Sequence, residues 1–138
     1  MAGEHKLEAE VRTPEGEVFK GELQMLSTRT AVGEVGILAE HIPMVARLVP
    51  AELRLHKSDS DVETYAQGEG WLEVFANRAR VLIAEAIPPG DLDVSDLRRR
   101  LDDAEQRLDG AEEGSAAAEQ AERERARAEA FIAIAESN

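Results

Sequence analysis

Three histidines are the side chains in this sequence that titrate near neutral pH and could serve as general acids, bases or metal ligands. His5, His41 and His56 lie in three different segments, and no two of them have the spacing of a ligand pair. The chain has no cysteine, which excludes disulfides, thiol catalysis and thiolate metal sites. It also has no Ser/His/Asp pattern, nucleophile elbow or phosphate-binding loop. We therefore expect ordinary surface or turn histidines, with no catalytic residue and no metal site.

Charged side chains are abundant, but their order does not suggest a reactive site. They make up 33% of the 138 residues, and the formal net charge is −13. The run Arg98–Arg100 could bind an anion, although its acidic neighbours favour a solvated helix face. The negative charge argues against nucleic acid as a partner, because phosphate binding requires a positive face. It also disfavours adsorption to an anionic lipid surface.

The most distinctive stretch is VGEVGILAEHIPMVARLVP, at residues 32–50. Its apolar residues are interrupted by Gly33, Gly36 and Pro43. Glycine permits backbone angles that other residues resist, and proline removes a donor from a strand ladder. The stretch therefore predicts a short strand, a sharp corner and a second short strand.

The first 87 residues have the pattern of an antiparallel β-sandwich or barrel. Leu7, Ala9 and Val11 alternate with charged residues, as in a half-buried strand. Turn signals follow at residues 13–16 and 58–61. Further short apolar segments of strand type occur at 18–26, 53–55, 62–66, 71–75 and 81–84. We expect an N-terminal β-sandwich domain over residues 1–87.

Residues 88–90, Pro-Pro-Gly, predict a linker, because two prolines continue neither a helix nor a central strand. Residues 91–138, rich in Ala, Glu, Arg and Leu, predict an antiparallel helical hairpin, with Asp93 as the first N-cap. The expected apolar positions are Leu97, Leu101, Ala104 and Leu108 in the first helix and Ala117, Ala121, Ala128, Ile132 and Ala135 in the second, which is expected near 115–135. Because small side chains bury little area, we expect a weakly docked hairpin that can occupy more than one position.

The pattern G-E-x-G-I-x-x-x-H-x-P at residues 33–43 resembles the signature of the epsilon subunits of F-type ATP synthases. Residues 11–21, VRTPEGEVFKG, and residues 67–74, QGEGWLEV, also resemble segments of that family. The resemblance implies a β-sandwich followed by a helical hairpin. It further implies a non-catalytic subunit of the rotor's central stalk, which couples ion-driven rotation of the c-ring to ATP synthesis in the catalytic head. The hairpin would restrain ATP hydrolysis.

The resemblance also implies partners and contact residues. Glu34, on the glycine turn, corresponds to the family's acidic contact with the c-ring. His41 and Thr13 correspond to positions at the interface with the gamma subunit. The hairpin would meet the beta and alpha subunits transiently, and its basic residues are Arg123, Arg125 and Arg127.

A nucleotide site of this family is altered in the sequence. Some bacterial members bind ATP through an I/L-D-x-x-R-A motif at the start of the first helix. This chain keeps Leu92 and Asp93 but has Asp96 in place of the arginine. Because a carboxylate repels phosphate where arginine would pair with it, we expect weak or absent ATP binding and no other cofactor.

The chain shows no N-terminal signal and no apolar stretch near the roughly 20 residues that span a bilayer. The residues alone favour a cytosolic protein whose membrane connection, if any, runs through another protein. The resemblance implies a peripheral subunit at the cytoplasmic face of the bacterial cell membrane, without direct membrane insertion. The alternative is a free-standing β-sandwich adaptor with a helical tail, and an enzyme is a more distant third.

Overall fold

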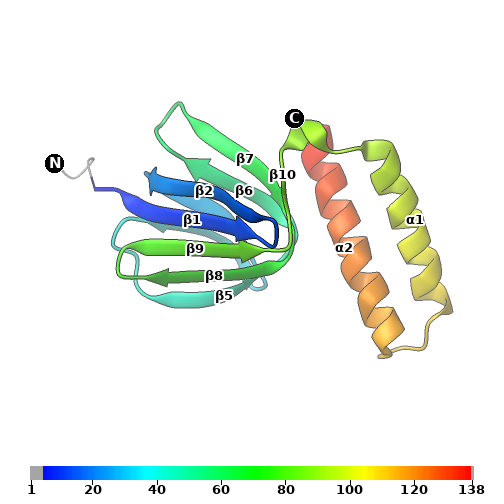
Figure 1. Cartoon of the computed structure of the whole chain (residues 1–138). Coiled ribbons are helices and arrows are strands. Elements are labelled where there is room, and N and C mark those ends of the chain that lie inside the picture. Colours follow the sequence, from blue (N-terminus) through cyan, green and yellow to red (C-terminus); the bar gives the residue numbers. More distant parts are fainter. Residues whose placement is uncertain (1–4, 138) are drawn as a thin grey trace. The chain divides into compact units, whose positions relative to one another are not determined.

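The computed structural model describes residues 5–137 of the chain. Two compact units follow each other along the sequence, with the boundary between Ile87 and Pro88 (Figure 1). The strands of the first unit are β1 (Leu7–Thr13), β2 (Gly16–Leu23), β3 (Met25–Thr30), β4 (Gly33–Leu38), β5 (Met44–Leu48), β6 (Ala51–His56), β7 (Val62–Gln67), β8 (Gly70–Phe75), β9 (Arg78–Ile83) and β10 (Ala86–Ile87). The second unit contains the 3-10 helix η2 (Pro89–Asp91) and the helices α1 (Val94–Gly110) and α2 (Ala116–Ser137).

The strands form one continuous hydrogen-bonded sheet that folds over into a sandwich. The strand order is β10-β7-β6-β3-β5-β8-β9-β1-β2, and β4 pairs with β3 off this path. Strands β5, β8, β9 and β1 lie next to one another in one layer (Figure 1). Every pairing is antiparallel except that of β1 with β9, which is parallel. The predicted β-sandwich is confirmed, with this one parallel pair as a departure.

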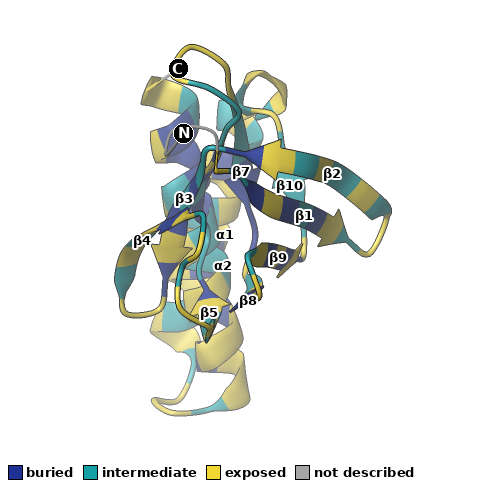
Figure 2. Ribbon diagram, turned by 90° about the vertical axis from the view of Figure 1, so that its left-hand side faces the viewer, coloured by how far each residue is buried: buried dark blue, intermediate teal, exposed yellow. Residues whose placement is uncertain are grey.

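The core lies between the two layers and follows from the alternation in the sequence. Leu7, Ala9 and Val11 are buried, whereas Glu8 between them is exposed (Figure 2). The remaining buried members of the core come from seven other strands: Leu23, Leu26, Ile37, Leu48, Leu53, Leu55, Leu72, Val74, Ala79, Val81 and Ile83. Burial of these side chains supplies the main driving force for the sandwich.

The glycine-containing stretch folds as the sequence predicts, into strand β4, a corner at residues 39–43 and strand β5. One detail of the prediction is wrong. Glu34 lies within β4 and not in a turn, because the left-handed residue at this point is Gly33, with φ 137°, and the strand already begins there. The preceding turn consists of Ala31 and Val32.

The second unit begins with an ordered connection. The predicted linker is partly structured, since Pro89–Asp91 form a single 3-10 turn. Asp93 is the N-cap of α1, as predicted, and its side chain accepts a hydrogen bond from the backbone amide of Asp96. Ser115 plays the same part for α2, because its hydroxyl accepts a hydrogen bond from the amide of Ala118.

The two helices of the second unit pack with small residues on their buried sides. In α1, Leu97 and Ala104 are buried, and the other predicted leucines are half-buried. In α2, the prediction of Ala117 as a buried residue is wrong, since Ala117 is exposed and its neighbour Ala118 is buried. The buried residues of α2 are Ala118, Ala121, Ala128, Phe131, Ile132 and Ile134.

Candidate protein-binding face

The residues predicted to contact one partner, Thr13 and His41, lie at opposite ends of the same layer. Thr13 ends β1, and the parallel register with β9 places it beside the end of that strand. His41 lies in the corner before β5, whose first residue pairs with Val74 near the other end of β8. The two positions are therefore about 20 Å apart along the strands, at roughly 3.3 Å per residue.

Exposed apolar side chains alternate with charged ones, such as Arg47 and Glu73, on the outward face of β5, β8 and β9 between these two positions. Trp71 of β8 stands directly opposite Leu82 of β9, and their exposed fractions are 53% and 44%. Phe75 and Val45 are exposed by 66% and 69%. We call these four residues, Val45, Trp71, Phe75 and Leu82, the apolar patch. Clustered apolar residues with aromatic members on a surface mark a site of protein association.

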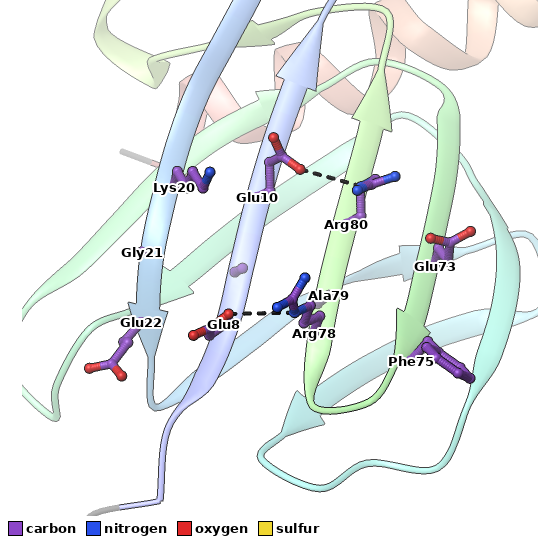
Figure 3. Close-up of a pocket in the computed structure, with 11 residues that line it drawn as sticks. Glu8, Glu10, Lys20, Gly21, Glu22, Glu73, Phe75, Arg78, Ala79 and Arg80 are labelled. Carbon is purple, nitrogen blue, oxygen red and sulfur yellow. Dashed lines mark ion pairs between the residues drawn. The ribbon is translucent and has the colours of Figure 1, made fainter.

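The same face becomes charged toward β1 and β2, where a groove of about 560 Å³ lies (Figure 3). Arg78 Nε lies 3.6 Å from Glu8 Oε2, and Arg80 Nε lies 3.3 Å from Glu10 Oε1. Figure 3 shows both pairs crossing from β9 to β1. A hydrogen bond from Arg12, supported by the charge of Arg80, lowers the pKa of Glu10.

Part of the charge on this face is paired across its strands. Such exposed pairs, Arg78 with Glu8 and Arg80 with Glu10, contribute little to stability. Within residues 5–137, no three His, Asp or Glu side chains gather as a metal site. The face therefore presents exposed apolar side chains next to charged ones.

Glu34 lies on the other layer, beside the turn that precedes β4. Its side chain is 80% exposed, and Arg29 Nη2 on the paired strand lies 3.3 Å from Glu34 Oε1. Val32, in the turn itself, is 97% exposed. Thr30 pairs with Leu48, and Leu48 pairs with Gly70. The turn therefore lies at the same end of the sandwich as Thr13.

The arginines of the second helix do not form one basic surface. Arg125 bonds to Glu122 of its own helix, and its guanidinium lies 3.8 Å from Glu129. The guanidinium carbon of Arg127 lies 4.5 Å from the centre of the Phe131 ring. Because residues two apart differ by 200° around a helix, Arg123 projects from a side different from that of Arg125.

The helices are joined by an ion pair that sequence reasoning did not identify. Arg107 of α1 donates two hydrogen bonds, of 3.0 and 2.9 Å, to the carboxylate of Glu124 in α2, and a third to Asp103. The hydrogen bond from Arg107 lowers the pKa of Glu124. Arg98 likewise bonds to Glu136 across the helices. No local spacing in the sequence indicates contacts 17 or 38 residues apart.

The residues at the altered nucleotide motif are already engaged in hydrogen bonds. The Asp93 carboxylate caps α1 through the amide of Asp96. The carboxylate of Asp96 accepts hydrogen bonds from Arg100 and Arg99, which lower its pKa. A phosphate would therefore have to compete with Asp96 for these two arginines. Leu92, the remaining residue of the motif, is half-buried.

The apolar patch is the feature that sequence reasoning missed. Trp71, Phe75 and Val45 lie within predicted strands, and alternation separates two faces without saying which one the second layer covers. One signal was present. In β8, apolar side chains occupy both faces, since Trp71 and Phe75 flank buried Leu72 and Val74. A strand of this kind is expected to have its second face covered as well.

Comparisons with known proteins match most of the chain. A model of the family "ATP synthase, Delta/Epsilon chain, beta-sandwich domain" matches residues 6–89. The ATP synthase epsilon chain of Persephonella marina is 38% identical over 95 residues, which are 69% of this chain and 70% of that protein. The epsilon chain of a Sulfurihydrogenibium species is 30% identical over 126 residues, 91% of this chain and 94% of that protein.

Solved structures support the fold. A chain of the mitochondrial ATP synthase of Euglena gracilis superposes with a TM-score of 0.82 at 21% identity, covering 94% of this chain and 81% of the other. A chain of the central stalk and c-ring of the Tetrahymena thermophila enzyme superposes with a TM-score of 0.61 at 17% identity, covering 93% of this chain and 95% of the other.

Neither α1 nor α2, over the part of the chain that is described, is long and apolar enough to cross a membrane.

Proposed function

Because this chain belongs to the family of ATP synthase epsilon chains, we propose that it is a non-catalytic subunit of the central stalk. In this role it couples ion-driven rotation of the c-ring to ATP synthesis in the catalytic head. It is a peripheral subunit at the cytoplasmic face of a bacterial cell membrane, held there by other subunits. Family membership argues against the alternative of a free-standing adaptor.

The partner of the apolar patch, on this proposal, is the gamma subunit. The supporting observation is the position of the patch between Thr13 and His41, the two expected gamma contacts. Trp71 and Phe75 are large, rigid side chains of the kind that dominates binding energy at protein interfaces. The charged groove beside the patch would fix the orientation of the partner.

The c-ring contact is proposed for residues 31–34, which comprise the turn and the start of β4. Val32 is almost fully exposed, and the Glu34 carboxylate stays accessible beside Arg29. An exposed carboxylate suits a basic or polar loop of the ring. The hairpin is proposed to restrain ATP hydrolysis only weakly, because Arg125 is paired with Glu122 and Glu129 of its own helix. Asp93 and Asp96 of the altered nucleotide motif already accept hydrogen bonds within α1. This supports the proposal that the hairpin does not bind ATP.

The gamma contact is tested by replacing Trp71 with Ser and measuring affinity for the purified gamma subunit of the same organism by calorimetry. We expect at least a roughly tenfold loss of affinity, as for a central aromatic contact. The sandwich should remain folded, since Trp71 is outside the core. Val62→Ser is the matched control, because Val62 is an exposed apolar residue of the other layer. Equal binding by the two variants would refute the assignment of this face.

A further inference from the structure

A two-residue turn between β8 and β9 has an unusual backbone. Ala76 and Asn77 both have positive φ, 49° and 61°, between Phe75 and Arg78, which pair with each other. Positive φ at both central positions is the signature of the tight hairpin turn that matches the twist of the strands. Asparagine tolerates this conformation better than most residues. The turn alone therefore accounts for an Asn or a Gly at position 77.

The side chain of Asn77 does more than the turn requires. Its Nδ2 donates a hydrogen bond of 2.8 Å to the carbonyl of Lys6, at the start of β1. Its Oδ1 accepts one of 2.9 Å from the backbone amide of Glu40. Its own carbonyl accepts a hydrogen bond from the amide of Glu8. A single amide thus joins three chain segments that are 71 and 37 residues apart in sequence.

The segment held through Glu40 is the corner at residues 39–43, which we call the His41 loop. Glu40 has φ 64°, a conformation that costs free energy in a residue other than glycine and must be maintained by its surroundings. Within the loop, the amide of His41 donates to the carbonyl of Leu38. Ile42 is 74% exposed and contributes little packing. The hydrogen bond to Asn77 is therefore a principal restraint on this loop.

We propose that Asn77 is a positioning residue, whose side-chain amide holds the His41 loop in the conformation that the gamma subunit recognises. This inference rests on the proposed function, because it concerns the same interface. A loop ordered before binding loses less conformational entropy when the complex forms. Asn77 would thus raise affinity through Glu40, His41 and Ile42 without itself being the main contact.

The test replaces Asn77 with Gly, which keeps positive φ accessible and removes the amide. The matched control is Ala76→Gly, which gives the same turn equal backbone freedom but leaves the amide in place. Affinity for the purified gamma subunit is measured by calorimetry, and exchange of the Glu40 amide proton by NMR. Because the hydrogen bond that holds the Glu40 amide is lost, we expect Asn77→Gly to bind about fivefold more weakly. The Glu40 amide should exchange faster, while core amides such as that of Leu72 stay protected.

The outcomes separate this proposal from the one on which it rests. If the wild-type chain does not bind gamma, the proposed function fails and the positioning role fails with it. If the wild type binds and Asn77→Gly binds equally well despite rapid exchange at Glu40, only the positioning role is refuted. Should Asn77→Gly fail to fold, Asn77→Ala, which also lacks the acceptor for the Glu40 amide, takes its place. In each folded variant, affinity for the gamma subunit must fall when the Glu40 amide exchanges faster. A variant in which only one of these two quantities changes contradicts the proposal.

Discussion

Glu34 shows how a single exposed residue can matter to function and little to folding. Its carboxylate lies beside Arg29 on the paired strand, and both side chains are more than half exposed. Pairs of this kind contribute little to stability because water and salt screen them. Any selective value of Glu34 is therefore to be sought in what its carboxylate meets outside the chain.

We predict that Glu34→Lys impairs proton-driven ATP synthesis severalfold in membranes that carry the assembled enzyme. The free energy of unfolding should change by only about 0.5 kcal/mol, as is usual for surface substitutions. Asp59→Lys serves as the control. It makes the same charge change in an exposed loop, and the β3 register places that loop at the opposite end of the sandwich. A normal synthesis rate with Glu34→Lys would count against the c-ring contact.

At this scale, motifs in the sequence singled out polar residues and left the apolar patch unnoticed. Thr13, Glu34 and His41 were chosen from motifs, and whether they contact partners stays a prediction. The exposure of Trp71 and Phe75 could not be read from alternation, because it depends on which face the second layer covers. The amide of Asn77 escaped detection for a similar reason, since its partners are 37 and 71 residues distant.

Among the elements, the hairpin of α1 and α2 depends on polar contacts more than the sandwich does. Four of the eight buried residues described in its two helices are alanines, which bury little area. The paired Arg107 and Glu124 join the two helices, with side-chain exposures of 41% and 45%. Asp103 of α1 also faces Glu124, and its negative charge opposes the effect of Arg107 on the Glu124 pKa. The ion pair therefore makes the helix contact sensitive to pH and salt.

We predict that the hairpin loosens in acid. The pKa of Glu124 is lowered in the folded hairpin, so its contribution is complete above the ordinary carboxyl pKa. That contribution is lost as pH falls from there through the lower folded-state value. Exchange of α2 amides, followed against pH in the whole chain, should accelerate severalfold over this range.

Arg107→Gln should remove most of this acid dependence and raise exchange already at neutral pH. Arg99→Gln is the matched control, because Arg99 pairs within α1, with Asp96. Identical exchange profiles for the two variants would show that the Arg107–Glu124 pair does not hold the helices together.

Element prediction succeeded where the periodic signal was strong. Alternation of apolar and polar residues predicted the strands β1 and β5 to β9. The side-chain type of Asp93 predicted the N-cap of α1. Strand β10 has two residues, too few for any period to be visible. Glu34 was placed in a turn because glycines suggested one, but Gly33 supplies the positive φ and Gly36 continues the strand. The choice of Ala117 over Ala118 failed because adjacent alanines are indistinguishable in pattern.

On the scale of the whole molecule, the two units invite separate roles. The sandwich has its own core, and the second unit has its own helix contact. We propose that the first unit couples and the second regulates. Deletion of residues 91–138 should raise ATP hydrolysis by the assembled enzyme no more than a few-fold, because Arg125 is already paired with Glu122 and Glu129. Unchanged hydrolysis after this deletion would refute the proposed restraint.

The altered nucleotide motif leads to a prediction of its own. The isolated chain, titrated with ATP in a calorimeter, should give no binding heat at micromolar concentrations. The physical reason is the carboxylate of Asp96, which repels phosphate and already accepts hydrogen bonds from Arg99 and Arg100. The same titration of Asp96→Ala, which lacks this carboxylate, is the control. Micromolar ATP binding by the wild type would overturn the claim that the hairpin does not sense ATP.

The division of labour between the units rests on the sandwich alone holding the stalk partner. The direct measurement is the affinity of the purified gamma subunit for the whole chain and for the chain truncated after Pro89. Because every core strand and the whole apolar patch precede that residue, we predict that both form a one-to-one complex with similar affinity. A folded truncated chain that fails to bind gamma, or a whole chain that fails to bind it, would contradict the proposed function.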